Sequence, residues 1–159
     1  MGLKNLMGQG PNYVPAYQTS GTPFVTSSVA RSRNAGPDRV DFPYVTKNVT
    51  IRNTGGEDLR IAFTLSGSYA QGEAIGGSGH NKAVWSGVEP YQGDNYFLLP
   101  SSGSSDNPQV TLDVRCTHMF LMSDKPTAGT SFSLYAGLAG IAVAQFPILT
   151  ASNGFQGIG

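Results

Sequence analysis

The fold is decided by the stretch Val110-Thr-Leu-Asp-Val-Arg-Cys-Thr-His-Met-Phe-Leu-Met-Ser-Asp124, in which apolar and polar residues first alternate and an apolar run then follows. Val110, Leu112, Val114 and Cys116 are two positions apart, so they would share one face of a β-strand. The polar residues between them would lie on the opposite face. The stretch therefore predicts one or two strands within 109–123 that line a hydrophobic core.

Two segments upstream have the same two-residue period. In residues 45–52, Val45, Val49 and Ile51 share one side, while Thr46 and its polar neighbours share the other. In residues 59–65, Leu59 and every second residue after it are apolar, and a Gly-containing turn lies between the two segments. This pattern predicts a β-hairpin from 45 to 65. The predicted core residues are Val49, Ile51, Ile61, Phe63, Leu112, Val114 and Phe120.

The remainder of the chain has the composition of an all-β protein. Twenty-one Gly and ten Pro among 159 residues separate short apolar segments, and helical periodicity is nearly absent. Further strands are expected at 24–30, 83–86, 96–99 and 131–136, and a last one within 142–149. A total of about eight or nine strands without a helix indicates an antiparallel sandwich of two sheets.

These segments also carry a family resemblance. It is found in residues 45–64, Asn95-Tyr-Phe-Leu-Leu99, Leu112-Asp-Val-Arg-Cys116, Phe120-Leu-Met-Ser-Asp124 and Tyr135-Ala-Gly-Leu138. Together they resemble the single jelly-roll capsid proteins of large icosahedral double-stranded DNA viruses, and within that group the penton protein of the five-fold vertices. The resemblance covers residues 40 to 150 and consists of strand signatures, not of a catalytic motif.

The resemblance implies a fold, a function and partners. The fold would be a single jelly-roll β-sandwich of about eight antiparallel strands in two sheets. The function would be that of a structural virion protein, which self-assembles as a homopentamer at a capsid vertex. The partners would be the major capsid protein and minor capsid proteins. The protein would be made and assembled in the host cytoplasm and would reside in the virion.

We expect three parts: an N-terminal arm at 1–22, which Gly and Pro residues interrupt, a domain at 23–150 that the resemblance implies to be the jelly roll, and a C-terminal tail at 151–159. Neither 5–30 nor 126–159 contains a charged residue. Free tails are usually charged or strongly polar, so we expect these ends to be covered. The chain's own sheets are the favoured cover for residues 131–150, and either these sheets or neighbouring copies would cover residues 151–159. The residues predicted to take part in self-association are Tyr13, Tyr17, Arg31, Arg33 and Phe155.

Composition argues against several classes of protein. Only 13% of residues are charged, ten basic against ten acidic, so no basic surface is expected for nucleic acid. The single Cys116 cannot form an internal disulfide, and neither an export signal nor a lipid anchor is expected. The apolar window Leu134 to Ala151 contains Gly137, Gly140 and Pro147, so a buried pair of strands is expected there and not a membrane span.

No constellation for catalysis, metal binding or a cofactor is recognised, and the chain is expected not to be an enzyme. His80 and His118 are its only histidines. His118 could share a metal with Cys116, but two ligands do not complete a zinc site. Under strict alternation, Asp113 faces away from both of them, so a nucleophilic triad is not expected. Two further carboxylates, Glu73 and Glu89, and the glycosylation sequon at Asn48 are taken as having no functional role.

An alternative function remains open, that of a ligand-binding sandwich such as a carbohydrate-binding or receptor-ligand-like module. Trp85 and Tyr91, with Tyr69 and Tyr96 nearby, could form an aromatic platform for a sugar ring. Packing is the favoured interpretation of these side chains, because aromatic residues in sandwiches more often anchor a core or an interface.

Overall fold

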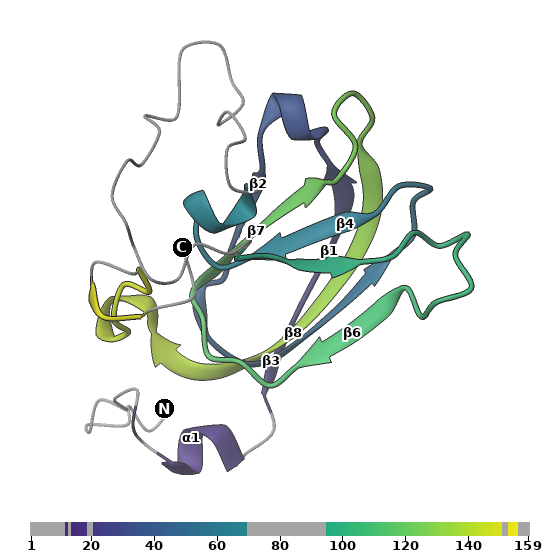
Figure 1. Cartoon of the computed structure of the whole chain (residues 1–159). Helices are drawn as coiled ribbons and strands as arrows, with labels where there is room; N and C mark the ends of the chain where they lie inside the picture. Colours follow the sequence, from purple (N-terminus) through teal and green to yellow (C-terminus); the bar gives the residue numbers. More distant parts are fainter. Residues whose placement is uncertain (1–11, 13, 19–20, 70–94, 151–152, 156–159) are drawn as a thin grey trace.

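Residues 12, 14–18, 21–69, 95–150 and 153–155 are described by the computed structural model, and they form two four-stranded antiparallel sheets (Figure 1). Sheet A has the strand order β1-β8-β3-β6, and sheet B has the order β2-β7-β4-β5. The prediction of an all-β sandwich with about eight antiparallel strands is confirmed. The strands are β1 (Thr22–Ala30), β2 (Asp38–Asp41), β3 (Tyr44–Asn53), β4 (Leu59–Ala62), β5 (Phe97–Leu99), β6 (Gln109–Leu112), β7 (His118–Ser123) and β8 (Thr130–Ala142).

The strand pairs are nested along the chain. The first strand pairs with the last, β1 with β8, and the second with the second to last, β2 with β7. Inside these, β3 pairs with β6 and β4 with β5. Two further pairings, β3 with β8 and β4 with β7, join these pairs into the two sheets.

The predicted hairpin from 45 to 65 is wrong. β3 and β4 are consecutive strands, but they belong to opposite sheets. The turn between them carries the chain across the sandwich, and the buried Asn53 holds it there. The side-chain amide of Asn53 donates to the carbonyl oxygens of Glu57 at 2.8 Å and Pro100 at 3.0 Å. Its side-chain oxygen accepts a hydrogen bond from the Thr130 hydroxyl at 3.0 Å. Alternation predicted the strands but carried no information about their partners.

The stretch from Val110 to Asp124 is also divided between the sheets. β6 ends at Leu112 in sheet A, and β7 begins at His118 in sheet B. The connection is held by Thr46, whose hydroxyl donates to the Val114 carbonyl at 2.7 Å and accepts from the Cys116 amide at 2.9 Å. Thr46 was expected on a solvent face but is fully buried, because the pairing of β3 with β8 shifts register on both sides of it.

One hydrophobic core fills the space between the sheets. Val49, Ile51 and Ile61 are buried in it as predicted. Phe120 is buried too, but it lies on the outer face of sheet B beside Arg60 and Met122 and not in this core, contrary to the prediction. The other three predicted core residues, Phe63, Leu112 and Val114, are partly buried and pack against it. Sheet B adds Leu59, Leu99, Met119 and Leu121 to this core, and sheet A adds Phe132, Leu134 and Leu138.

β8 is one strand and not the broken pair expected near Gly137 and Gly140. It runs for 13 residues through both glycines. A Cβ at Gly137 would lie 2.8 Å from the side-chain oxygen of Asn48, so a larger residue there would require the Asn48 side chain to move. The amide of Gly137 donates to that same oxygen at 3.1 Å. The glycines therefore permit close packing and a positive φ of 73° at Gly140 within a continuous strand.

The N-terminal arm contains a short helix, α1 (Val14–Gln18), where no regular structure was expected (Figure 1). Tyr17 of α1 packs against a second, smaller cluster made by the buried Val45 and Ile141. Three 3-10 turns complete the described residues: η1 (Arg33–Ala35), η2 (Ser66–Ser68) and η3 (Val143–Gln145). The strand expected at 83–86 lies outside the described residues.

Candidate interaction surface

The outer face of sheet A is open to solvent. Pairing aligns Val25 of β1 with Tyr135 of β8, and Tyr135 with Thr50 of β3. Thr50 is in turn opposite Thr111 of β6, so one row of side chains crosses all four strands. Val25 is 70% exposed and Tyr135 is 43% exposed. This face is therefore available to another molecule.

Short hydroxyl side chains dominate this face. The Ser27 hydroxyl donates to the Ser133 hydroxyl at 3.0 Å across β1 and β8. The Thr50 and Thr111 hydroxyls are 2.9 Å apart across β3 and β6. The four strands contain only two charged residues, Lys47 and Arg52, and no acidic residue. A face of this kind can pack against another uncharged surface without burying unpaired charge.

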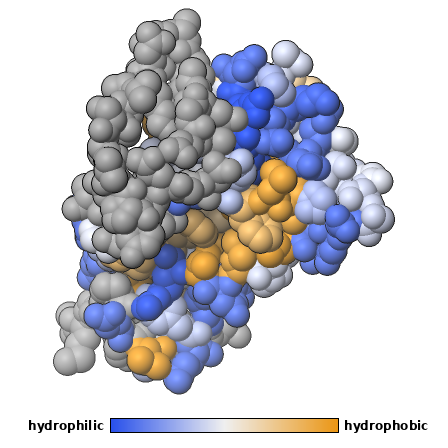
Figure 2. Space-filling view, viewed as in Figure 1, coloured by the Kyte–Doolittle hydropathy of each residue, from blue (hydrophilic) through white to orange (hydrophobic). Residues whose placement is uncertain are grey.

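Apolar side chains are also exposed on sheet B, at its edge strand β5. Phe97 and Leu98 of β5, the edge strand of sheet B, are 50% and 44% exposed. Figure 2 shows apolar surface gathered on the side of the molecule where β4 and β5 lie in Figure 1. Residues 100–108 connect β5 to β6, which is the edge strand of sheet A opposite β1. The exposed Phe97 and Leu98 are therefore close in sequence to that edge.

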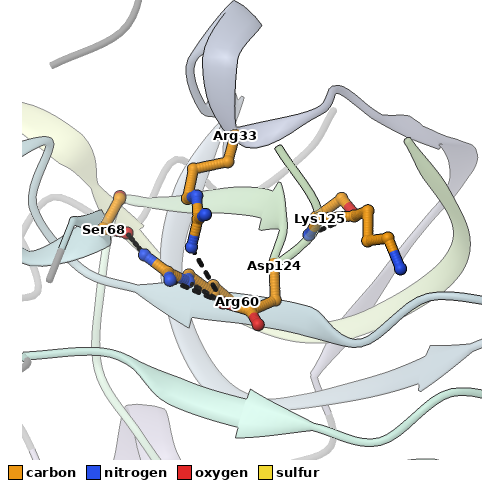
Figure 3. A network of polar contacts seen from close by, with 6 residues as sticks. Arg33, Arg60, Ser68, Asp124 and Lys125 are labelled. Atoms are coloured by element: carbon orange, nitrogen blue, oxygen red, sulfur yellow. Dashed lines mark hydrogen bonds and ion pairs between the residues drawn. The ribbon is translucent and has the colours of Figure 1, made fainter. Parts of the chain in front are cut away.

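The central strands of sheet B are buried on both faces, and a polar network covers part of the outer one (Figure 3). Arg60 of β4 is only 3% exposed, and its Nε donates to the Asp124 carboxylate at 2.6 Å. It also donates to the Ser68 carbonyl at 3.4 Å, and its guanidinium lies 4.2 Å from the centre of the Tyr96 ring. Arg33 approaches the same carboxylate oxygen at 3.9 Å. Sequence reasoning missed this network, because Arg60 occupied an expected solvent position.

The residues predicted to mediate self-association make contacts inside their own chain. The Tyr17 ring lies 4.9 Å from the guanidinium of Arg115. Arg31 forms an ion pair with Asp38 at 2.7 Å. The amide of Phe155 donates to the Thr150 carbonyl at 3.2 Å, and its side chain is half-buried. Tyr13 lies outside the described residues. These contacts leave the prediction of a role between copies untested.

Of the residues considered for chemistry, Cys116 is buried and His118 is half-buried. Burial raises the pKa of the Cys116 thiol to about 11, against a smaller lowering by its hydrogen bond to Thr46. Burial also lowers the pKa of His118, with Arg39 adding to this effect and Asp41 opposing it. No group of three or more His, Cys, Asp or Glu residues that could hold a metal occurs within the described ranges.

The aromatic platform is not assembled from its described members. Tyr69 is buried at 2% exposure, and the Tyr96 ring packs against Arg60. Trp85 and Tyr91, together with His80, Glu73 and Glu89, lie outside the described residues. In the part of the chain that the structure covers, no helix is long and apolar enough to span a membrane.

Comparison with known proteins gives no match: no family model, no curated protein and no solved structure matches this chain.

Proposed function

We propose that this chain is a structural virion protein: a penton that self-assembles as a homopentamer at the five-fold vertices of an icosahedral capsid. The nested strand pairing is the observation that carries this proposal. Such pairing arises when one long antiparallel hairpin is wound into two sheets. The first strand then pairs with the last, the second with the second to last, and so on. That winding is the jelly roll, which is frequent among viral capsid domains.

The surface chemistry supports assembly as the function. A ring of identical copies needs two different surfaces on each copy, because one side of a copy contacts the other side of the next. The chain offers an open, almost uncharged face on sheet A and exposed apolar side chains on β5. Interfaces that form between copies are poor in charge at their centre, as both of these surfaces are.

The proposed partners follow from the position at a vertex. The major capsid protein would surround the ring, and minor capsid proteins would lie beneath it. The charge-free ends, residues 5–30 and 126–159, are the proposed contacts for neighbouring copies and for docking. The protein would be assembled in the host cytoplasm and would act in the virion by shape and burial alone.

The experiment that tests this proposal is native mass spectrometry of the purified full-length chain, with sedimentation velocity as a second measurement. A particle of five copies is expected at micromolar concentration. A chain that stays monomeric across the accessible concentration range, or that stops at a dimer, would contradict the homopentamer. The carbohydrate-binding alternative predicts quenching of tryptophan fluorescence by a glycan, which the penton proposal does not.

A further inference from the structure

The two edge strands of sheet A carry no charged side chain, which is unusual for exposed edges. β1 is an edge strand of nine residues without a charged side chain, and β6 is an edge strand of four uncharged residues. By contrast β2, at the edge of sheet B, carries Asp38, Arg39 and Asp41. Edge strands present unpaired N–H and C=O groups, and proteins commonly protect them with charges, as β2 does. β1 lacks that protection.

β1 is also exposed along its length. Val25 is 70% exposed and Val29 is 59% exposed, and Ser27 between them faces solvent as well. Among the described residues, β8 is the only strand that pairs with β1, and β3 is the only one that pairs with β6. Within the described residues, both strands therefore retain one side on which a further strand can add.

The directions of the strands determine what fits there. Sheet A has four antiparallel strands, so its two edge strands, β1 and β6, run in opposite directions. In a cyclic ring every copy points the same way. When two such copies lie side by side, β6 of one is antiparallel to β1 of the next. A ring can thus extend the antiparallel ladder without reversing any copy.

We propose that β1 of each copy pairs edge to edge with β6 of the neighbouring copy, so that sheet A continues around the ring. This inference rests on the proposed pentamer and identifies the surfaces that build it. The pairing adds backbone hydrogen bonds between copies. It also brings uncharged side chains of the two copies together on the outer face. Val25, Ser27 and Val29 would face Gln109 and Thr111, in the same manner as Ser27 already faces Ser133 within one chain.

Lysine substitution at the edge is the first test. Val25→Lys and Val29→Lys place charges on side chains that are exposed in the single chain, so the fold is retained. A Lys on an edge strand opposes strand addition. In the double variant we expect the native mass to fall from five copies to one. The matched control is Leu65→Lys, which places the same charge on an exposed apolar side chain outside sheet A, and it should still form the pentamer.

Cysteine cross-linking is the second test. The double variants Ser27→Cys with Thr111→Cys, and Ser27→Cys with Gln109→Cys, place thiols on the same face of β1 and β6. Mild oxidation should link neighbouring copies and give a covalent ladder of up to five chains for at least one of the two double variants. The wild-type chain is the control, because its only thiol, Cys116, is buried and has a raised pKa of about 11.

The outcomes separate this inference from the proposed function. A wild-type chain that does not form a pentamer overturns the ring itself. A wild-type pentamer that survives both lysine substitutions and gives no cross-links overturns only the pairing of β1 with β6. A covalent dimer from Ser27→Cys alone would mean that two β1 strands pair with each other, and it would also overturn the inference. Loss of the ring in the Leu65→Lys control would show that a charge added at any exposed apolar site prevents assembly, and it would overturn the assignment of the contact to the edge of β1.

Discussion

The two sheets of the sandwich differ in what they do with their outer faces. In sheet B, β4 and β7 are buried on both faces, and Arg60, Phe120 and Met122 on the outer side have 9% exposure or less. In sheet A, the outer face carries hydroxyl groups and exposed valines, and only one side is buried. The outer side of β4 and β7 in sheet B therefore adds to the stability of the fold, whereas the outer face of sheet A is left available for contact with other molecules.

The difference between the sheets can be read in the sequence once the strands are assigned. The alternating half of Val110 to Asp124 contains β6, which lies in the half-open sheet A. The apolar run from Met119 to Met122 is β7, which is covered on both sides. A strand buried on both faces gives a continuous apolar run, and a strand with one open face gives alternation. The pattern thus reports the environment of β6 and β7, but not that of β4, which is buried on both faces although the charged Arg60 interrupts its apolar residues.

Loss of Asp124 is expected to have the largest effect on the stability of sheet B. Asp124→Ala removes the carboxylate from Arg60 and leaves a buried cation without its main partner. Breaking a buried ion pair in this way costs about 3–5 kcal/mol, and the lower end applies because Asp124 is 38% exposed. Urea denaturation of the variant measures the change in the free energy of unfolding.

The control for that experiment is an exposed ion pair in the same sheet. Arg39 and Asp41 are 2.7 Å apart, but their side chains are 54% and 63% exposed. Asp41→Ala should change the free energy of unfolding by less than about 1 kcal/mol. Equal losses in Asp124→Ala and Asp41→Ala would show that the Arg60 network does not stabilise sheet B more than a surface pair does.

Matched substitutions on the two outer faces test the comparison directly. Met122→Ala removes a fully buried side chain from the outer face of sheet B, so it should lower the free energy of unfolding by about 2–5 kcal/mol. Tyr135→Ala removes a larger side chain from the outer face of sheet A and should cost less than about 1 kcal/mol in the monomer, because that side chain is exposed. A reversed order of the two losses would contradict the roles assigned to the sheets.

Removal of the arm is expected to have a smaller effect. Deletion of residues 1–20 removes Tyr17 from Val45, Ile141 and Arg115, so part of an aromatic surface and a cation–π contact are lost. A loss of about 1–3 kcal/mol is expected, with the sandwich still folded by circular dichroism. Tyr17→Ala in the full chain should account for most of it. An unfolded truncated chain would make α1 an essential part of the domain, contrary to its assignment as an arm.

The sequence predicted the class of fold but not the arrangement of the strands. Two-residue periods identified β3, β4, β6 and β7 and most of their core residues. Neither the separation of β3 from β4 nor that of β6 from β7 was visible, because alternation is the same whichever strand lies alongside. The buried positions of Thr46 and Arg60 were missed as well, since they depend on a register shift and on distant partners.

The candidate surface was predicted only in part. The absence of charge in 5–30 and 126–159 indicated that these ends are covered. These two segments contain β1 and β8, which are neighbouring strands of sheet A. That β1 is an edge strand of the described sheet could not be predicted, because its place depends on pairings between residues 100 or more positions apart. The contrast with the charged β2 became meaningful only when both strands were found at sheet edges.

The smallest expected effect is on the pH dependence of stability, and it concerns His118 on the outer side of sheet B. Burial and Arg39 lower the pKa of His118 below 6.5 in the folded chain, so the folded state favours the neutral ring. The unfolded chain then binds more protons between the folded pKa and 6.5, and the free energy of unfolding falls as the pH decreases through that window. Above pH 7 the contribution of the neutral ring is fully present. His118→Phe should remove this part of the pH dependence, whereas Asp41→Ala should steepen it, because Asp41 opposes the lowering. Thermal melts between pH 5 and 8 measure both variants. A wild-type melting temperature with the same pH dependence as His118→Phe would show that protonation of His118 does not affect folding.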